Sequence, residues 1–230
     1  MERLADAVSP DVARGATVLV PVGSVEQHGP HLPLDTDTVI ARAVAERLAP
    51  LVEGVVAPAL TYGASGEHQH FPGTVSIGTD ALVTTLVELG RSLSTWAGRV
   101  VFVNGHGGNL VALERAVALL RAEGRRAVWV PCAVAGADAH AGRTETSLML
   151  FLDPSRVRLD RAEAGNTEPL GRLMPRLRTH GVGAVSANGV LGDPEGANAP
   201  EGDRLVQEMV RRAHARVSVS HEHHTDGFTP

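Results

Sequence analysis

Carboxylate and imidazole side chains gather in one short stretch of the N-terminal part of the chain. Within twelve residues the sequence places Glu26, His28, His31, Asp35 and Asp37. This combination suits divalent ions of intermediate softness, such as zinc, manganese or ferrous iron. In an extended segment, Glu26 and His28 point to the same side. The stretch therefore predicts a metal site. The alternative is that Asp35 or Thr36 only caps a helix and that the histidines lie at the surface.

A second cluster, residues 104–109, has the sequence Asn-Gly-His-Gly-Gly-Asn and opens a predicted helix. Glycines allow the backbone to approach a ligand closely. The N–H groups at a helix N-terminus can stabilise a carboxylate or a developing oxyanion. A dinucleotide-binding turn is not predicted, because Leu110 occupies the place of its last glycine. His106 is thus a candidate metal ligand, and Gly107 and Gly108 are candidate substrate-binding residues. The alternative is a tight turn with an incidental histidine.

A third cluster contains Asp138, His140 and Glu145 around Gly142. Glu145 is a candidate metal ligand or general base, although a carboxylate there also stabilises the first turn of a helix. His140 is a candidate catalytic proton shuttle, because imidazole titrates near neutral pH. We expect both residues to be catalytic.

The stretch of residues 65–74 contains Ser65, His68 and His70. Its histidines either line the site or only cover the loop, and the sequence does not decide between the two. Ser65 and His68 are candidate substrate-binding residues. Ser65 is not predicted to be a nucleophile, because Glu67 stands where a nucleophile elbow has glycine. Cys132 is expected to be a small buried residue.

Hydrophobic periodicity predicts strands that alternate with helices. The expected strands cover residues 17–22, 55–60, 99–103 and 127–131. The expected helices cover residues 37–48, 79–96, 110–122, 144–152 and 201–217, with Thr79 as an N-cap and Gly124 just beyond the end of a helix. This alternation implies right-handed crossovers. The predicted fold class is α/β, with three α/β/α layers around a mostly parallel sheet.

The three numbered clusters each follow a predicted strand. The first cluster follows the first strand, the second cluster the third strand, and the third cluster the fourth strand. In such folds, ligands bind beyond the carboxyl ends of the strands. We therefore expect these clusters to converge on one shared site.

Composition narrows the class of protein. The chain has 230 residues and a net charge of −5, and 3% of its residues are aromatic, so no nucleic-acid partner is expected. It has no apolar run long enough to span a membrane and no secretory signal. A single cysteine fits a reducing cytoplasm.

We expect one domain over residues 1–220. We expect residues 221–230 to form a disordered tail in which His221, Glu222, His223 and His224 are solvated.

The motifs together resemble the creatininase (creatinine amidohydrolase) family of metal-dependent amide hydrolases, from about Val18 to Val210. The resemblance rests on PVGSVEQHGPHLPLDTD, HFPGTVSIGT, VNGHGGN, HAGRTETS and GVLGDPEGAN. It implies a creatininase-like fold, a homo-oligomer and a pair of divalent metals, Fe²⁺ or Zn²⁺, with Mn²⁺ as a further option. By the family pattern, Glu26, Asp37 and His106 hold one metal. His28 holds the second, and Asp37 bridges the two.

The sequence departs from this pattern at one position. In creatininase, a glutamate two residues after the Asn-Gly-His histidine binds the second metal, whereas this chain has Gly108 there. An ion left with His28 and a shared carboxylate has too few ligands for a catalytic site. Glu145 is our candidate replacement. The alternative is that the second site is weak and that one metal suffices.

The resemblance implies hydrolysis of an amide or peptide bond by metal-activated water. Coordination lowers the pKa of water from 15.7 to about 7. Within the family, the chain most resembles members that cut a modified precursor peptide near its C-terminus and release a cross-linked Val-Tyr-derived unit. The alternatives are a hydrolase of creatinine-like cyclic amides or formamides, and a non-catalytic metal-binding protein.

Overall fold

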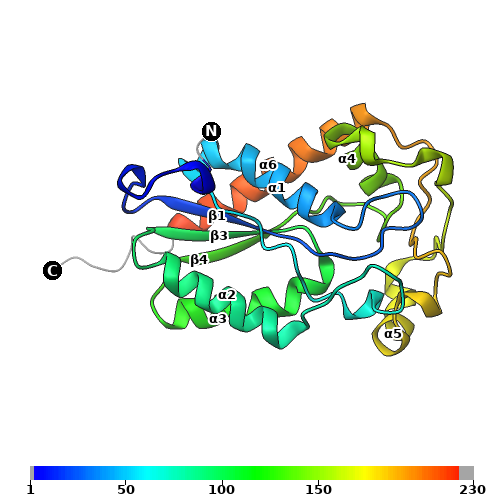
Figure 1. Ribbon diagram of the computed structural model, residues 1–230, viewed down its shortest axis with the longest axis horizontal. Helices are drawn as coiled ribbons and strands as arrows, with labels where there is room; N and C mark the ends of the chain where they lie inside the picture. The colour runs from blue at the N-terminus through cyan, green and yellow to red at the C-terminus, as the bar shows by residue number, and fades with distance from the viewer. Residues whose placement is uncertain (1–2, 223–230) are drawn as a thin grey trace.

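The computed structural model of the protein describes residues 3–222. At its centre lies a four-stranded sheet in the order β2-β1-β3-β4, and every neighbouring pair of strands is parallel. The strands are β1 (Thr17–Val22), β2 (Gly54–Val56), β3 (Arg99–Asn104) and β4 (Ala127–Pro131). Helices cover both faces of the sheet (Figure 1). The predicted three-layer α/β/α class is confirmed.

Alternating strand residues separate the core into two halves. On one face, Leu19, Val101 and Val128 pack against α1 (Thr36–Leu48), α4 (Arg143–Leu152) and α6 (Ala199–Glu222). On the other face, Val18 and Phe102 pack against α2 (Thr79–Leu93) and α3 (Leu110–Ala122). Because successive side chains of a strand point to opposite faces, a continuous apolar strand can serve both layers. This explains why the strands read as unbroken apolar runs.

The predicted second strand is confirmed only over its first two residues. Strand β2 ends at Val56, although residues 55–60 were expected to be extended throughout. Ala57 N–H still donates to Leu19 O at 2.9 Å, but the next bond to β1 comes from Leu60, which donates to Pro21 O at 2.9 Å. Pro58 lies between them and has no N–H to donate. The segment therefore follows β1 without continuing the ladder.

Most predicted helices are confirmed, with shifted ends. Helix α3 spans the expected residues, and Gly124 beyond it has a φ of +77°, which favours glycine. Helix α2 ends at Leu93 rather than at residue 96, and Gly78, not Thr79, occupies its N-cap position. Helix α6 is longer than expected and runs on to Glu222, so the first two residues of the predicted tail are helical. The other histidines of that tail, His223 and His224, lie outside the described residues.

The sequence pattern did not predict one of the helices. Helix α5 (Leu170–His180) lies far from the N-terminus, beyond the carboxyl edge of the sheet (Figure 1). Its buried residues Leu173 and Leu177 pack with Val182 and Leu191 in a small separate cluster. Pro175 lies inside the helix, and a proline is uncommon there.

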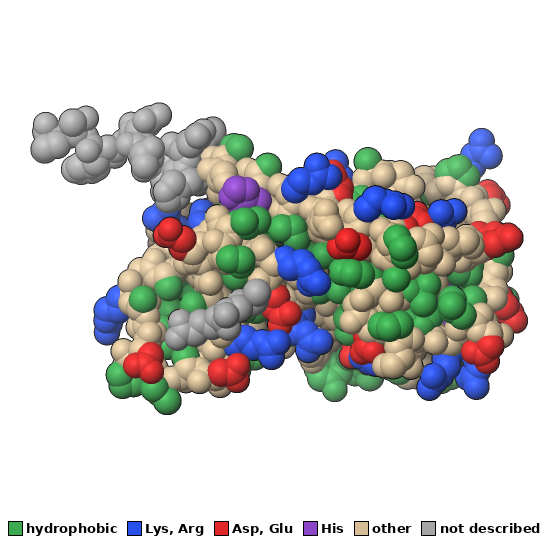
Figure 2. All heavy atoms as spheres, turned by 90° about the horizontal axis from the view of Figure 1, so that it is seen from above, with side chains coloured by type: hydrophobic (Ala, Val, Ile, Leu, Met, Phe, Trp, Pro, Cys, Tyr) green, Lys and Arg blue, Asp and Glu red, His purple; other side chains and the backbone are tan. Residues whose placement is uncertain are grey.

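The surface carries both signs of charge. Figure 2 shows basic and acidic side chains interspersed among hydrophobic ones on one face, without a continuous basic stripe on that face. Among the described residues, every helix is too short or too polar to cross a bilayer.

The register of the strands brings the polar clusters to one edge. Val22 at the end of β1 pairs with Asn104, and Asn104 pairs with Pro131. The loops that follow these three strands therefore start side by side, as the strand order requires.

Candidate active site

Asp37, in the first turn of α1, joins the first two clusters. Its carboxylate is buried, with Oδ1 3.2 Å from His28 Nε2 and Oδ2 3.3 Å from His106 Nδ1. The Ser24 hydroxyl donates a hydrogen bond to Oδ2 at 2.6 Å. One carboxylate thus contacts imidazoles from the loops after β1 and β3.

The loop after β1 folds back on itself and holds Glu26 in the interior. Glu26 N–H donates to Leu34 O at 2.9 Å, and Leu32 N–H donates to His28 O at 3.3 Å. The Glu26 side chain has no solvent exposure. This backbone pairing places Glu26 and His28 in the same interior region, as their alternation predicted.

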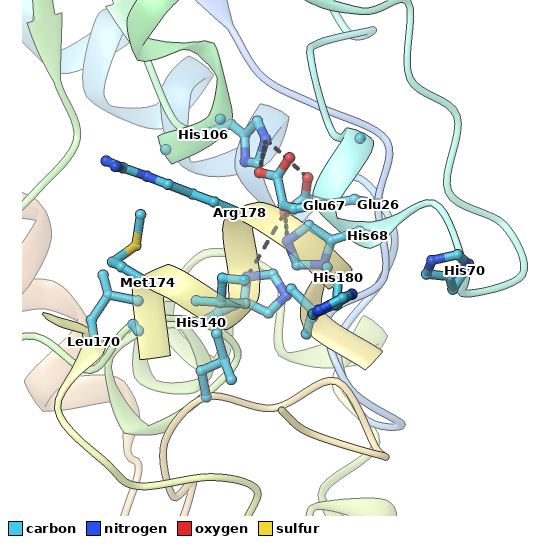
Figure 3. A pocket seen from close by; sticks show the side chains of 18 of the residues that line it. Glu26, Glu67, His68, His70, His106, His140, Leu170, Met174, Arg178 and His180 are labelled. Atoms are coloured by element: carbon cyan, nitrogen blue, oxygen red, sulfur yellow. Dashed lines mark ion pairs between the residues drawn. The ribbon is translucent and has the colours of Figure 1, made fainter. Parts of the chain in front are cut away.

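Glu26 is surrounded by imidazoles (Figure 3). His106 Nε2 lies 3.1 Å from Oε2, while His68 Nε2 and His140 Nδ1 lie 3.4 Å and 3.8 Å from Oε1. Neither carboxylate oxygen has a hydrogen-bond partner. A buried anion without hydrogen bonds is costly unless a cation compensates it. The site therefore fits a bound cation.

Glu145, in the first turn of α4, reaches the same centre. Its Oε2 accepts a hydrogen bond from Ala141 N–H at 2.6 Å and lies 3.8 Å from His28 Nε2 and 3.9 Å from His140 Nδ1. Among the described residues, three triads have ligand atoms within 4.8 Å of one another: Glu26–His28–Asp37, His28–His140–Glu145 and Glu26–His68–His140. Oxygen and imidazole donors in such sets suit zinc, manganese or iron.

His106 lies outside those triads but touches both carboxylates of the first cluster. Its two ring nitrogens face Glu26 and Asp37, so the ring bridges them rather than presenting one nitrogen to a shared point. Asn104 and Asn109 hold the turn that carries it: Asn104 Nδ2 donates to His106 O at 2.7 Å, and Asn109 Nδ2 donates to Gly23 O at 3.0 Å.

The buried charges shift one another's pKa values. Burial alone would lower the pKa of His28, but Asp37 opposes it and raises the pKa to about 10. For His106, Glu26 overcomes burial in the same way and raises the pKa. Conversely, burial would raise the pKa of Glu26, but His106 lowers it to about 2. Protons and a cation therefore compete for the same imidazoles, and cation binding strengthens as pH rises.

The centre faces a cavity of about 760 Å³. One wall consists of Glu26, Glu67, His68, His106 and His140, with Gly107 and Gly108 beside them, and the opposite wall is α5 (Figure 3). Of the predicted substrate-binding residues, His68, Gly107 and Gly108 line this cavity. Ser65 is fully buried behind it, with Oγ 3.4 Å from His106 Nε2.

The structure favours a structural role for several of the other candidates. His31 Nε2 lies 2.8 Å from Thr146 Oγ1, and burial lowers the pKa of His31 to about 4. Asp35 forms an ion pair with Arg156 near the surface. Asp138 accepts a hydrogen bond from Thr144 N–H at 3.1 Å, at the start of α4. These contacts hold loops and a helix end in place.

Two cavity residues were missed by the sequence reading. Glu67 Oε1 lies 3.4 Å from His106 Nε2. Burial would raise the pKa of Glu67, but His106 lowers it. Its position between Gly66 and His68, in a stretch whose candidate site residues are Ser65 and His68, was the available signal. Arg178 lines the cavity from α5, and because that helix was missed, nothing in the sequence reading could place it.

Gly108 leaves room for Glu67. A Cβ atom at position 108 would lie 2.4 Å from His106 Nε2, 2.4 Å from Ala64 O and 2.5 Å from Glu67 Oε1. Because Ala64 O belongs to the backbone, it cannot move aside as easily as a side chain. The absence of a side chain at residue 108 is thus a condition for this packing.

Gly108→Ala should therefore displace the His106 ring and weaken metal binding, by about 10- to 100-fold in affinity, as for other changes that disturb ligand orientation. Titration of the purified variant with Zn²⁺ measures this. Gly107→Ala is the matched control, since a Cβ at residue 107 would meet nothing within 4 Å. Equal zinc affinities in the two variants would contradict the steric argument.

Comparisons with known proteins agree with this geometry. A family model named Creatininase and described as creatinine amidohydrolase matches residues 5–217. The chain is 62% identical over 206 residues to the mycofactocin precursor peptide peptidase of Mycolicibacterium smegmatis, covering 87% of this chain and 83% of that protein. A mutant creatininase complexed with creatine superimposes with a TM-score of 0.78 at 26% identity, covering 94% and 97% of the two chains. A structure named "Creatininase Mn" superimposes with a TM-score of 0.74 at 28% identity, covering 89% of this chain and 90% of that chain.

Proposed function

Because the chain belongs to the creatininase family, we propose that it hydrolyses an amide bond in a modified mycofactocin precursor peptide, near the C-terminus of that peptide. The observation that carries this proposal is the 62% identity with a relative named as the peptidase for that precursor. A buried acid–imidazole centre open to a cavity of about 760 Å³ supports it. The released product would be the cross-linked Val-Tyr-derived unit.

The proposal assigns two divalent metals to the centre, Fe²⁺ or Zn²⁺, with Mn²⁺ as an option. Glu26, Asp37 and His106 would hold one, and His28, Asp37 and Glu145 the other. Glu145 is supported by its membership of a triad with His28 and His140. When bound, such ions lower the pKa of water and polarise the carbonyl group.

The protein's own residues would position the peptide and move the proton. His140 would deliver a proton to the leaving amine, since its Nδ1 faces the centre and its ring lines the cavity. Backbone pairing with Leu191, whose N–H donates to His140 O at 2.8 Å, fixes this ring in the cavity wall. The amides of Gly107 and Gly108, at the entry to α3, would face the substrate carbonyl.

The cavity favours a peptide over a compact ring as the substrate. Its far wall consists of the α5 side chains Leu170, Met174, Leu177 and Arg178, which offer apolar and cationic contacts away from the acid–imidazole centre. A small cyclic amide would leave this wall uncovered. A creatinine-like substrate remains the competing hypothesis, supported by 35% identity to the creatinine amidohydrolase of Pseudomonas putida.

A cleavage assay tests the function. The purified protein is incubated with the modified precursor peptide or with creatinine, before and after chelation, and the products are identified by mass spectrometry. We expect metal-dependent release of the C-terminal unit from the peptide and negligible turnover of creatinine. Turnover of creatinine alone would favour the cyclic-amide hypothesis. Bound metal without turnover of either substrate would favour a non-catalytic metal-binding protein.

We further propose a homo-oligomer in the cytoplasm. The family resemblance supports the assembly. The one cysteine of the sequence, Cys132, supports a reducing compartment, since it leaves no intrachain disulfide to form. Cys132 is only partly buried, packed against the core on one face of the sheet, rather than buried as the sequence predicted. Its surroundings still raise the pKa of the thiol, in keeping with an inert residue.

A further inference from the structure

Gln27 lies between two predicted metal ligands and contacts the imidazoles of His68 and His140. We propose that Gln27 sets the proton positions on both rings, making His68 an N–H donor and leaving the lone pair of His140 free at the centre. The proton positions follow from the contacts of Gln27 alone. Their use in hydrolysis rests on the proposed function.

The orientation of the Gln27 amide is fixed by two backbone groups. Its Oε1 accepts a hydrogen bond from Gly29 N–H at 2.8 Å, and its Nε2 donates to Gly189 O at 3.1 Å. The opposite orientation would set an amide N–H against Gly29 N–H and an oxygen against Gly189 O. One amide hydrogen of Gln27 is therefore used, and one remains.

His140 must carry its proton on Nε2. That nitrogen lies 2.8 Å from the backbone oxygen of Gln27, which can only accept a hydrogen bond. The 3.0 Å approach of Gln27 Nε2 to the same nitrogen is then a contact between two donors. In the neutral ring, Nδ1 keeps its lone pair, and this atom faces Glu26 and Glu145.

The second amide hydrogen of Gln27 goes to His68. Gln27 Nε2 lies 2.8 Å from His68 Nδ1, so this ring nitrogen accepts, and the neutral ring carries its proton on Nε2. That N–H lies 3.4 Å from Glu26 Oε1 at the cavity wall. His68 then supplies no lone pair to the triad that it forms with Glu26 and His140.

The surrounding backbone is shaped around this amide. Gln27 is 5% exposed, and a Cβ atom at Gly189 would lie 1.9 Å from Gln27 Oε1. Gly189 also has a φ of +82°, a conformation that side chains disfavour. A segment 162 residues away along the chain thus leaves space for the Gln27 side chain and accepts its hydrogen bond.

The assignment separates the roles of two neighbouring histidines. His140 can accept a proton or bind a cation through Nδ1, whereas His68 can donate an N–H to an oxygen that gains negative charge. Gln27 does not line the cavity, so it acts through the two rings and is a positioning residue.

Gln27→Glu tests the assignment. A carboxylate oxygen in place of Nε2 can only accept, so His68 Nδ1 should gain a proton. His140 should keep its Nε2 proton, because a backbone oxygen holds it. Long-range ¹⁵N–¹H spectra of the full-length, zinc-loaded protein, labelled with ¹⁵N-histidine, report both rings, and His68→Gln and His140→Gln identify their signals. A wild-type His68 protonated on Nδ1, a His140 without a proton on Nε2, or an unchanged His68 in Gln27→Glu would overturn the proposal.

Gln27→Met keeps the proposal testable where Gln27→Glu does not fold. We expect a mixture of His68 tautomers and a kcat lowered by about 10- to 100-fold, with zinc content and KM little changed. The matched control for Gln27→Glu is Gln69→Glu, the same change at an exposed neighbour of His68, which should leave the ring signals and kcat unaltered. A wild-type His68 spectrum in Gln27→Met also overturns the proposal. If the spectra agree but no peptide is cleaved, the proposed function fails and the assignment stands.

Discussion

Asp37→Asn should lower kcat/KM for the precursor peptide by about 10³-fold or more and remove most of the bound metal. The carboxylate lies within 3.3 Å of both His28 and His106, so its loss affects both proposed metal positions. A cation contributes several kcal/mol of transition-state stabilisation, which corresponds to this change in rate. Elemental analysis of the purified variant and steady-state kinetics measure the two effects.

Asp35→Asn is the matched control, because it makes the same chemical change two residues away. Asp35 pairs with Arg156 near the surface and does not face the centre. Exposed ion pairs contribute at most about 1 kcal/mol, so metal content and rate should stay near wild type. Should Asp37→Asn keep full metal content, the carboxylate is not a ligand and the assignment of the centre is wrong.

Glu145→Gln should lower kcat/KM by about 10²-fold or more and reduce the bound metal from two ions to one. Glu145 Oε2 lies 3.8 Å from His28 Nε2 and 3.9 Å from His140 Nδ1, and we propose that it replaces the glutamate that creatininase has at the position of Gly108. The amide keeps the size of the side chain but provides a weaker ligand. Metal content per subunit distinguishes this loss from a change in the peptide site.

The control for Glu145→Gln is Glu114→Gln on the exposed face of α3. It should retain both metal content and activity. Full metal content together with full activity in Glu145→Gln would show that Glu145 is not the replacement ligand. Glu67, which contacts His106 from the cavity wall, would then be the next carboxylate to test.

The convergence of the site could be predicted from the sequence because parallel strands impose it. Glu26, His106 and Glu145 follow three different strands, and the strand order brings their loops to one edge of the sheet. That loops after parallel strands meet at one edge follows from the alternation of strands and helices alone. Apolar periodicity reveals this alternation in the sequence. Capping roles were harder to separate from ligand roles, since Asp35 and Asp37 have the same chemistry and differ only in the direction of their side chains.

The cavity wall could not be predicted, because it depends on packing between distant segments. Helix α5 is held by Leu173 and Leu177 against residues 182–191, and its internal Pro175 argues against a helix in the sequence. Arg178 reaches the cavity only through that packing. Similarly, the end of β2 depends on Pro58 meeting a particular hydrogen-bonding position of β1, which no local pattern specifies.

Helix α6 has a consequence for how the protein is made. Val206, Met209, Val210 and Ala213 belong to the core cluster that also contains Leu19 and Val101. The part of this sheet face that α1 and α4 do not cover therefore stays exposed on the ribosome until this last described helix has emerged. Until then, the nascent chain exposes a surface that chaperones bind and that favours aggregation.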